Sequence, residues 1–257
     1  MQAARKALLW VVTVWGVLVY GAPLPGEGFR VETDVFTANQ QQPVAEFLTL
    51  FHAGVIYDYQ LTEPKWVTIF DTTRQRFILL DPGNRTKTEL STADIESFHQ
   101  QVRAVMAGRD EAFFSPQFRY EYDASQRVHV LSNERWSYRA RGVVPKQPEA
   151  VAEYRAFADW YAQLSAMYPG SVPPYGRLEL NRVLAEHGQV PEMVERTISI
   201  ARVFPYKQDV VRTQHLYTWL LSEQDHRRIR KTGDDMASFS FLPADQFLRA
   251  RSAKANR

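Results

Sequence analysis

The stretch LTLFHAGVIYDY (residues 48–59) decides the fold. It is rich in β-branched and aromatic residues, and only Ala53-Gly54 interrupts it, so we expect two strands joined by a tight turn. Apolar side chains occupy consecutive positions, whereas a half-exposed strand alternates apolar and polar residues. Apolar residues therefore point to both faces of this hairpin, and the second apolar face needs an explanation.

The sequence around this hairpin predicts an antiparallel α+β fold. The strand-like runs number about eleven, and the helical runs fall between blocks of strands rather than between single strands, which disfavours a doubly wound parallel sheet. The runs with strand character are residues 29–36, 44–53, 55–61, 65–71, 76–81, 85–91, 118–123, 127–132, 136–144, 192–204 and 209–222. Those with helical periodicity are residues 91–108 and about 148–187.

The N-terminus is typical of a secretory signal peptide over residues 1–22. A basic segment, MQAARK, precedes the apolar run ALLWVVTVWGVLVY (7–20), and small residues follow. The apolar run is shorter than the about 20 residues that a spanning helix needs. Cleavage after Gly21 or Ala22 would leave a periplasmic or secreted protein, and an uncleaved N-terminal anchor is the alternative. We expect one domain over residues 23–222 and a partly helical C-terminal extension over 223–257.

The composition argues against several classes of function. The chain has no cysteine, which removes disulfides, cysteine-based zinc sites and thiol nucleophiles. The formal net charge of +2 gives no support to a nucleic-acid partner. No phosphate-binding loop, nucleophile elbow or metalloprotease motif occurs. His52, His129 and His215 fall in predicted strands and could converge, but ordinary strand histidines are the simpler interpretation.

We therefore predict no enzyme, with no catalytic residue, no metal and no cofactor. A hydrolase would need a cleft with a nucleophile, which no motif in the sequence indicates. The basic segments HRRIRK (226–231) and RARSAKANR (249–257) could contact anionic lipid headgroups. A solvated helix face and a loose tail are the alternative interpretation of these two segments.

The longer stretch AEFLTLFHAGVIYDYQLTEPKWVTIFDTTRQRFILLDPGNRTKTEL (45–90) resembles the front half of the LolA-like superfamily of periplasmic lipoprotein carriers. The matching residues are mostly turn and aromatic residues: Gly54, Tyr57, Tyr59, Pro64, Phe77, Leu79, Asp81 and Pro82. The resemblance covers about residues 28–140. The chain departs from the carriers at His52-Ala53-Gly54, where they favour a basic residue before a proline, so their lid-locking arginine has no clear counterpart. The insertion at 148–187 and the tail beyond residue 222 are further departures.

The resemblance implies a strongly curved, incomplete β-barrel whose concave face is apolar and covered by helices. Such a groove can hold an acyl chain, which gains about 0.8 kcal/mol for each buried CH₂ group. The expected protein is a monomeric, non-enzymatic binder of an acyl chain, lipid or lipoprotein in the cell envelope. The alternative is an envelope scaffold or protein-binding module without a lipid ligand.

Candidate lining residues come from both strand faces, because a one-residue error in register exchanges the faces. They are Phe47, Leu48, Leu50, Phe51, Ile56, Tyr57, Tyr59, Trp66, Ile69, Phe70, Phe77 and Leu79. A helical stripe supplies candidate lid residues: Tyr154, Phe157, Tyr161 and Leu164. The segment YPGSVPPYG (168–176) could serve as a pivot for this lid, and a permanent core helix is the alternative.

Overall fold

The computed structural model describes residues 28–38, 40–200 and 207–255 of the 257-residue chain. The predicted signal peptide lies outside the described residues. Within them, the chain forms an α+β fold with one open sheet of twelve strands and six helices. Among the same residues, no helix combines the length and apolarity that crossing a membrane requires.

The strands occupy two blocks of neighbouring strands in the sheet, although they fall into three groups along the chain. The first block is an antiparallel meander of β1 (Gly28–Thr37), β2 (Ala45–His52), β3 (Val55–Gln60), β4 (Val67–Asp71), β5 (Arg76–Asp81) and β6 (Thr86–Ser91). The second block contains β7 (Arg119–Asp123), β8 (Val128–Ser132), β9 (Trp136–Val143), β10 (Val190–Ile200) and β11 (Lys207–Thr218). A short twelfth strand, β12 (Ser240–Phe241), pairs in parallel with β6 and was not predicted.

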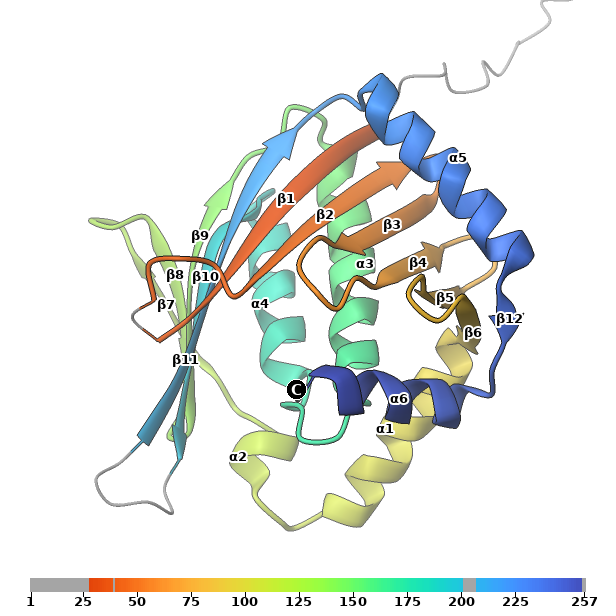
Figure 1. Cartoon of the computed structure of the whole chain (residues 1–257). Coiled ribbons are helices and arrows are strands. Elements are labelled where there is room, and N and C mark those ends of the chain that lie inside the picture. Colours follow the sequence, from red (N-terminus) through yellow and green to blue (C-terminus); the bar gives the residue numbers. More distant parts are fainter. Residues whose placement is uncertain (1–27, 39, 201–206, 256–257) are drawn as a thin grey trace, which may run out of the picture.

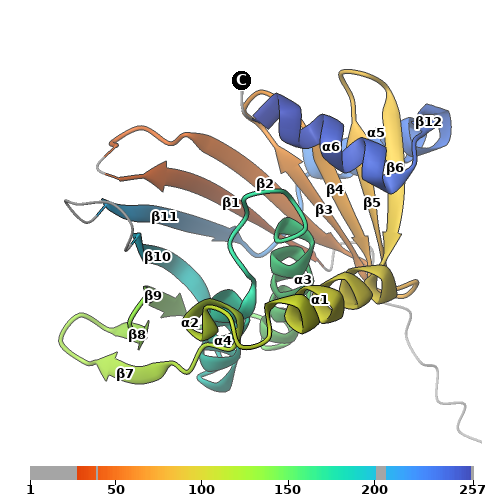
Figure 2. The same cartoon turned by 90° about the horizontal axis from the view of Figure 1, so that it is seen from below.

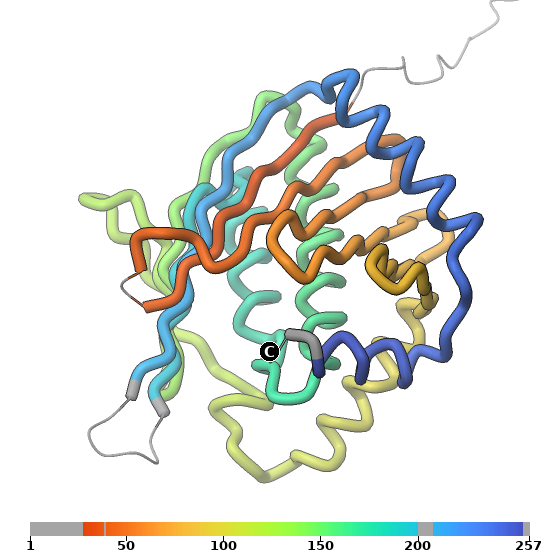
Figure 3. Tube along the Cα trace, viewed as in Figure 1, coloured from red at the N-terminus to blue at the C-terminus, as the bar shows by residue number. Residues whose placement is uncertain are grey.

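The two blocks meet in the middle of the sheet. The strand order is β12-β6-β5-β4-β3-β2-β1-β11-β10-β9-β8-β7, so the first strand lies between β2 and β11. Val31 of β1 pairs with Thr49 on one side and with Tyr217 on the other. Figure 3 shows the early strand β1 running beside the late strand β11.

The helices follow β6, β9 and β11 along the chain. Residues 92–187 contribute α1 (Thr92–Met106), α2 (Glu111–Phe114), α3 (Glu149–Ser165) and α4 (Tyr175–Glu186). The segment after residue 222 forms α5 (Glu223–Ser238), β12 and α6 (Ala244–Ala255). Helix α1 is capped by Ser91, whose hydroxyl accepts a hydrogen bond from the Asp94 backbone N–H at 3.0 Å.

The hairpin between β2 and β3 turns at Ala53-Gly54, as the sequence predicts. Both residues have positive φ angles, 49° and 74°, which suit the two-residue turns that join twisted strands. The turn sets the register, in which Phe51 faces Ile56 and Leu50 faces Tyr57. Alternate residues then point to opposite faces of the sheet.

The sheet bends around α1, α3 and α4 (Figures 1 and 2). We call the face toward these helices the inner face. Its core contains Phe51 and Phe70, and the Phe51 ring meets the Phe157 ring of α3 edge-on at a centroid distance of 5.8 Å. Phe70 stacks on Phe77 at 4.6 Å. The aromatic stripe of α3 therefore packs on the inner face of the first strand block.

The opposite, outer face of the same strands is covered by α5. Its apolar residues, Leu48, Leu50, Tyr59, Val67, Ile69, Ile78 and Leu80, form a buried cluster with Phe239, and Ile229 and Met236 of α5 pack against that cluster. The helix is held by an ion pair between Arg30 and Asp225 at 3.2 Å and a hydrogen bond between the Tyr59 and Thr232 hydroxyls at 2.9 Å. The chain itself thus covers the second apolar face.

The second strand block is covered by α4. Leu180, Val183 and Leu184 of this helix form a buried cluster with Trp136, Tyr138, Val194 and other residues of β8–β10. Gly176, in the first turn of α4, permits a close approach to β9, because a Cβ atom there would lie 2.6 Å from Cε2 of Tyr138. This contact fixes the start of α4 against the sheet and so positions the next residue, Arg177.

Candidate functional site

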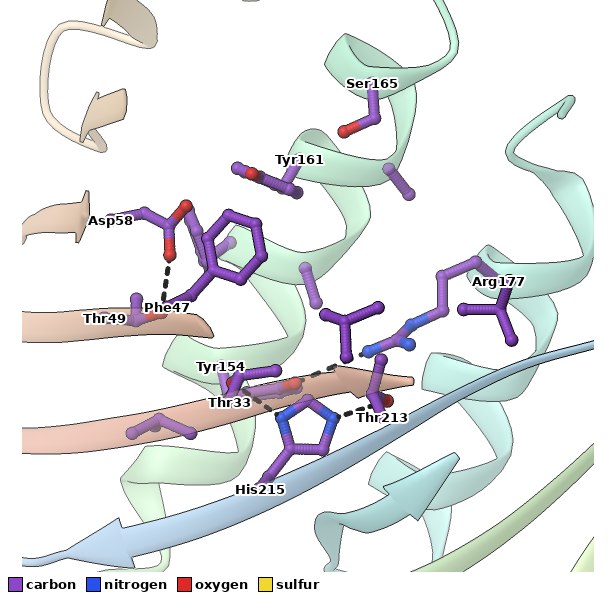
Figure 4. A pocket seen from close by; sticks show the side chains of 16 residues that line it. Thr33, Phe47, Thr49, Asp58, Tyr154, Tyr161, Ser165, Arg177, Thr213 and His215 are labelled. Carbon is purple, nitrogen blue, oxygen red and sulfur yellow. Dashed lines mark hydrogen bonds between the residues drawn. The ribbon is translucent and has the colours of Figure 1, made fainter. Parts of the chain in front are cut away.

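A cavity of about 480 Å³ lies on the inner face, between α3 and strands β1, β2, β3 and β11 (Figure 4). Its volume falls within the range of about 300–1,000 Å³ that is usual for small-molecule sites. The cavity is open to solvent rather than sealed. It is the candidate ligand site of the described part of the chain.

The walls of the cavity are mainly apolar. The sheet contributes Val31, Val35, Phe47 and Val211, and α3 contributes Phe157, Ala158 and Ala162. Ala158 and Ala162 are one turn apart on the helix and face the sheet across the cavity. Above β2, the aromatic side chains of α3 fill the space between the helix and the sheet. Above β1 and β11, the small side chains of Ala158 and Ala162 leave part of that space empty.

One end of the cavity carries a buried carboxyl group. Asp58 of β3 points to the inner face, and its Oδ1 atom accepts a hydrogen bond from the Thr49 hydroxyl at 2.7 Å. Burial raises the pKa of the Asp58 carboxyl to about 6, although hydrogen bonds from Thr49 and Tyr161 and the charge of Arg251 oppose this. The Asp58 carboxyl therefore titrates closer to neutral pH than an ordinary aspartate does.

The other end of the cavity contains a neutral histidine. The Nδ1 atom of His215 lies 2.9 Å from the Thr33 hydroxyl, and its Nε2 atom lies 3.0 Å from the Thr213 hydroxyl. Burial, and next the positive charge of Arg177, lower the pKa of His215 to about 3. A neutral imidazole has one donor and one acceptor, so the two hydroxyls hold this ring in place without neutralising any charge.

Arg177 brings a positive charge to the same end of the cavity. Its Nε atom donates to Oδ1 of Asn181 at 3.0 Å, and its Nη2 atom donates to the Tyr154 hydroxyl at 3.4 Å. In Figure 4 the guanidinium group points toward Tyr154 and His215. Both hydrogen-bond acceptors of Arg177 are uncharged.

The acidic residue Asp159 is bound by residues other than Arg177. Asp159 accepts a hydrogen bond from Asn181 at 2.8 Å and pairs with Arg155 at 3.4 Å. Among the described residues, no carboxylate oxygen lies within 4.0 Å of the Arg177 guanidinium. The cavity thus has a cation without a direct ion pair at one end and a buried carboxyl group at the other.

The structure separates the twelve predicted lining residues into two groups. Phe47 lines the cavity, while the other inner-face residues are buried in the core: Phe51, Ile56, Trp66, Phe70, Phe77 and Leu79. The remaining candidates point to the outer face and pack in the cluster beneath α5: Leu48, Leu50, Tyr57, Tyr59 and Ile69. These five residues do not line the cavity.

The four predicted lid residues are also divided. Tyr154, Phe157 and Tyr161 line the cavity from α3, whereas Leu164 is buried in the inner core. The helix therefore contributes both a wall of the cavity and part of the buried inner core. The stripe alone does not distinguish these roles.

The sequence interpretation missed most of the polar residues of the site. Asp58 is a charged residue within the apolar run VIYDY, and that conflict is the signal that could have identified it. His215 was considered, but the three strand histidines do not converge. His52 contacts His226 at a ring distance of 5.2 Å, and His129 contacts His187 at 4.7 Å. Within residues 28–38, 40–200 and 207–255, no group of three or more metal-binding side chains occurs.

Comparison with protein-family models gives no match, and comparison with curated proteins gives none at a significant level. The fold and the site must therefore define the class of protein by themselves. They describe an open antiparallel sheet, bent around helices, with a largely apolar cavity between one helix and the sheet. This arrangement can hold an elongated apolar molecule.

Proposed function

We propose that this chain is an exported, non-enzymatic, LolA-like binder of acyl chains in the cell envelope. The observation that carries the proposal is the cavity of about 480 Å³ with mainly apolar walls on the inner face. The basic and apolar N-terminal segment supports export. An open curved sheet with helices on its inner face is also what the resemblance to the carriers implies.

The residues that carry the resemblance occupy structural positions that suit it. Gly54 adopts a positive φ in the β2–β3 turn, and Pro64 lies between β3 and β4. Asp81 ends β5, and its carboxylate accepts a hydrogen bond from the Asn84 backbone N–H at 3.1 Å in the following turn. These turns shape the first strand block, which forms the floor of the cavity.

The energetics favour an acyl ligand of moderate affinity. Ten buried methylene groups would gain about 8 kcal/mol at about 0.8 kcal/mol each. Loss of translational and rotational freedom opposes this gain by at least about 4 kcal/mol. Ten buried methylene groups alone therefore give a dissociation constant of about 1 mM at best, and further methylene groups or polar contacts to a head group lower it.

The test is to fill the cavity from α3. The Ala162→Trp variant should bind a fluorescent fatty-acid analogue at least about tenfold more weakly, because the indole occupies the space of the chain. Ala156→Trp is the matched control, since Ala156 is exposed on the same helix and does not line the cavity. Native mass spectrometry of the wild-type protein should show bound acyl species.

Two results would contradict the proposal. One is a folded Ala162→Trp protein, with the wild-type circular dichroism spectrum, that binds the analogue as tightly as the control. The other is a wild-type protein that takes up no acyl species. The second result would favour the alternative, a protein-binding module, which draws support from the exposed edge strand β7 with Tyr120 and Tyr122 40% and 49% exposed.

The proposal includes α3 as a movable wall, with residues 168–176 as the pivot. Replacement of Phe157 and Tyr161 by Ser should weaken acyl binding while the protein stays folded. If α3 is instead a fixed core helix, the double variant should lose several kcal/mol of its free energy of unfolding, as loss of buried aromatic groups usually causes. Chemical denaturation distinguishes these outcomes.

A further inference from the structure

We infer that the cavity selects a single-chain amphiphile with a terminal carboxylate, a long-chain fatty acid, and that Arg177 binds the carboxylate. The inference rests on the proposed function and adds to it the chemical class and the orientation of the ligand. The head group would lie at the end of the cavity formed by Arg177, His215 and Tyr154. The chain would extend along the apolar walls toward Phe47.

The first argument is that Arg177 has no direct ion pair with any described residue. Its hydrogen-bond partners, Asn181 and Tyr154, are neutral, and Asp159, which interacts with Arg177 only through its charge, is bound directly by Arg155 and Asn181. A partly buried guanidinium without a direct anionic partner can bind an anionic group of a ligand. Arg177 also lies in the first turn of α4, where a positive charge opposes the helix dipole. The helix dipole therefore gives no reason for an arginine at this position.

The second argument is the set of groups beside Arg177. The hydroxyls of Tyr154 and Thr213 and the neutral ring of His215 line the same end of the cavity. Hydroxyl groups can donate hydrogen bonds to a carboxylate, and a guanidinium can bind it in a two-pronged geometry. None of these groups contributes a negative charge that would repel the ligand.

The third argument is the position of Asp58. Figure 4 shows Asp58 and Arg177 on opposite sides of the cavity. A carboxylate head group at the Asp58 end would meet a like charge in a site of low polarity, whereas at the Arg177 end it meets an opposite charge. The two ends thus fix the orientation of an anionic amphiphile.

The fourth argument is size. A carbon atom of an alkyl chain needs a volume of the order of a water molecule's share of the liquid, about 30 Å³. The cavity of about 480 Å³ therefore accommodates on the order of sixteen such atoms. A single alkyl chain of fatty-acid length fits a cavity of this size.

The experiment compares three ligands that share one alkyl chain: hexadecanoate, hexadecanol and hexadecyl phosphate. Their dissociation constants are measured at pH 8 by displacement of a fluorescent fatty-acid analogue, below the concentration at which the ligands aggregate. The wild-type protein should bind hexadecanoate about 10- to 100-fold more tightly than hexadecanol, since hydrogen bonds to charged groups contribute that much.

The variant Arg177→Gln should bind hexadecanoate about 10- to 100-fold more weakly than the wild type and bind hexadecanol equally well. Arg177→Lys should restore part of the preference, because it restores the charge but not the planar fork. Arg182→Gln is the matched control on the same helix. Arg182 pairs with Glu179 at 2.7 Å and does not line the cavity, so its loss should leave the preference unchanged.

The outcomes separate this inference from the proposed function. Equal binding of hexadecanoate and hexadecanol by the wild type, or an unchanged preference in Arg177→Gln, would overturn the carboxylate assignment and leave acyl binding intact. Tighter binding of hexadecyl phosphate than of hexadecanoate would overturn it in favour of a phosphate head group. Binding of none of the three ligands would overturn the proposed function itself.

Discussion

Both faces of strands β2–β5 carry large apolar residues, but one face is fully packed and the other borders a cavity. On the outer face, Leu48 and Leu50 belong to a buried cluster against which Ile229 and Met236 of α5 pack. On the inner face, Phe47 lies across a cavity from α3, whose facing residues include Ala158 and Ala162. The difference lies in the covering helix rather than in the strands. An apolar strand face therefore predicts that something covers it, and the size of the covering side chains decides whether a ligand can bind.

The largest expected effect is the loss of packing on the outer face. Leu50→Ala should lower the free energy of unfolding by about 2–5 kcal/mol, because the fully buried side chain leaves a hole that cannot collapse completely. Val211→Ala, in a half-buried cavity wall, should cost only about 1 kcal/mol or less. Urea denaturation measures both values. Equal losses would mean that the inner face is as tightly packed as the outer face.

The next largest effect is the pH dependence of stability that Asp58, on the inner face, should cause. The folded-state pKa of Asp58 is raised from 3.8 to about 6, so the folded protein holds more protons than the unfolded chain between these values. Its contribution to stability is therefore fully present below about pH 4 and is lost as the pH rises through 6. Asp58→Asn should be more stable than the wild type at pH 8 by up to about 3 kcal/mol, at about 1.4 kcal/mol per pKa unit.

Denaturation of Asp58→Asn and the wild type from pH 4 to pH 8 measures this difference. The advantage of the variant should shrink as the pH falls and disappear near pH 4. Asp234→Asn, at an exposed position of α5, provides a control that should show no such trend. A stability difference that stays constant over this range would show that the Asp58 carboxyl is ionised in the folded protein.

A moderate effect is expected where α5 attaches to the outer face. Asp225→Ala removes both the capping group of α5, which bonds to Ser222, and the partner of Arg30. Because Arg30 keeps Glu32 as a second partner, we expect a loss of about 1–3 kcal/mol rather than the full cost of an isolated buried charge. Thermal unfolding of Asp234→Ala, which should lie within about 0.5 kcal/mol of the wild type, provides the baseline. Similar losses for both variants would mean that α5 is not held by this contact.

The smallest effect should come from one buried hydroxyl. Tyr59→Phe removes the hydrogen bond to Thr232, which retains its bond to the Arg228 carbonyl at 3.0 Å. A loss of about 0.5–1.5 kcal/mol is expected, since no buried polar group is left without a partner. Tyr122→Phe on the exposed edge strand should change little, and a larger change there than at Tyr59 would contradict the contrast between buried and exposed positions.

Local features of the fold could be predicted from the sequence because the determining residues are neighbours in the chain. The turn at Ala53-Gly54, the cap at Ser91 and the break between α3 and α4 each depend on a few consecutive residues. The order of the strands could not be predicted in this way. β1 lies between β2 and β11, and no local pattern indicates that pairing.

The packing of α5 on the outer face was difficult to predict because many residues of this helix are charged. In α5 the buried or packed residues Ile229, Thr232 and Met236 follow helical spacing, but they lie within the highly charged sequence HRRIRKTGDDM (226–236). The charges led to an interpretation as a solvated face, while the narrow apolar stripe indicates packing. Two or three apolar residues are sufficient because the sheet supplies most of the apolar surface.

The cavity was hidden for a different reason. Large apolar residues are a visible signal in a sequence, but this site results from small residues, Ala158 and Ala162, at positions where large ones would fill the space. Its polar groups are also dispersed, with Asp58 in β3, Arg177 in α4 and His215 in β11. Only the folded chain brings these three residues to one cavity.

The pairing of β1 with β11 also determines the order of events in folding. Strands β1–β6 can form by joining neighbours in the chain, but Thr33 and His215, which face each other across this pair, are 182 residues apart. Contacts between such distant residues form slowly, because a long loop must close before they gain any stability. Until then, β1 presents a row of unpaired backbone groups that another chain can capture. The interval of greatest risk of aggregation therefore lasts from the formation of the β1–β6 meander until β11 joins it.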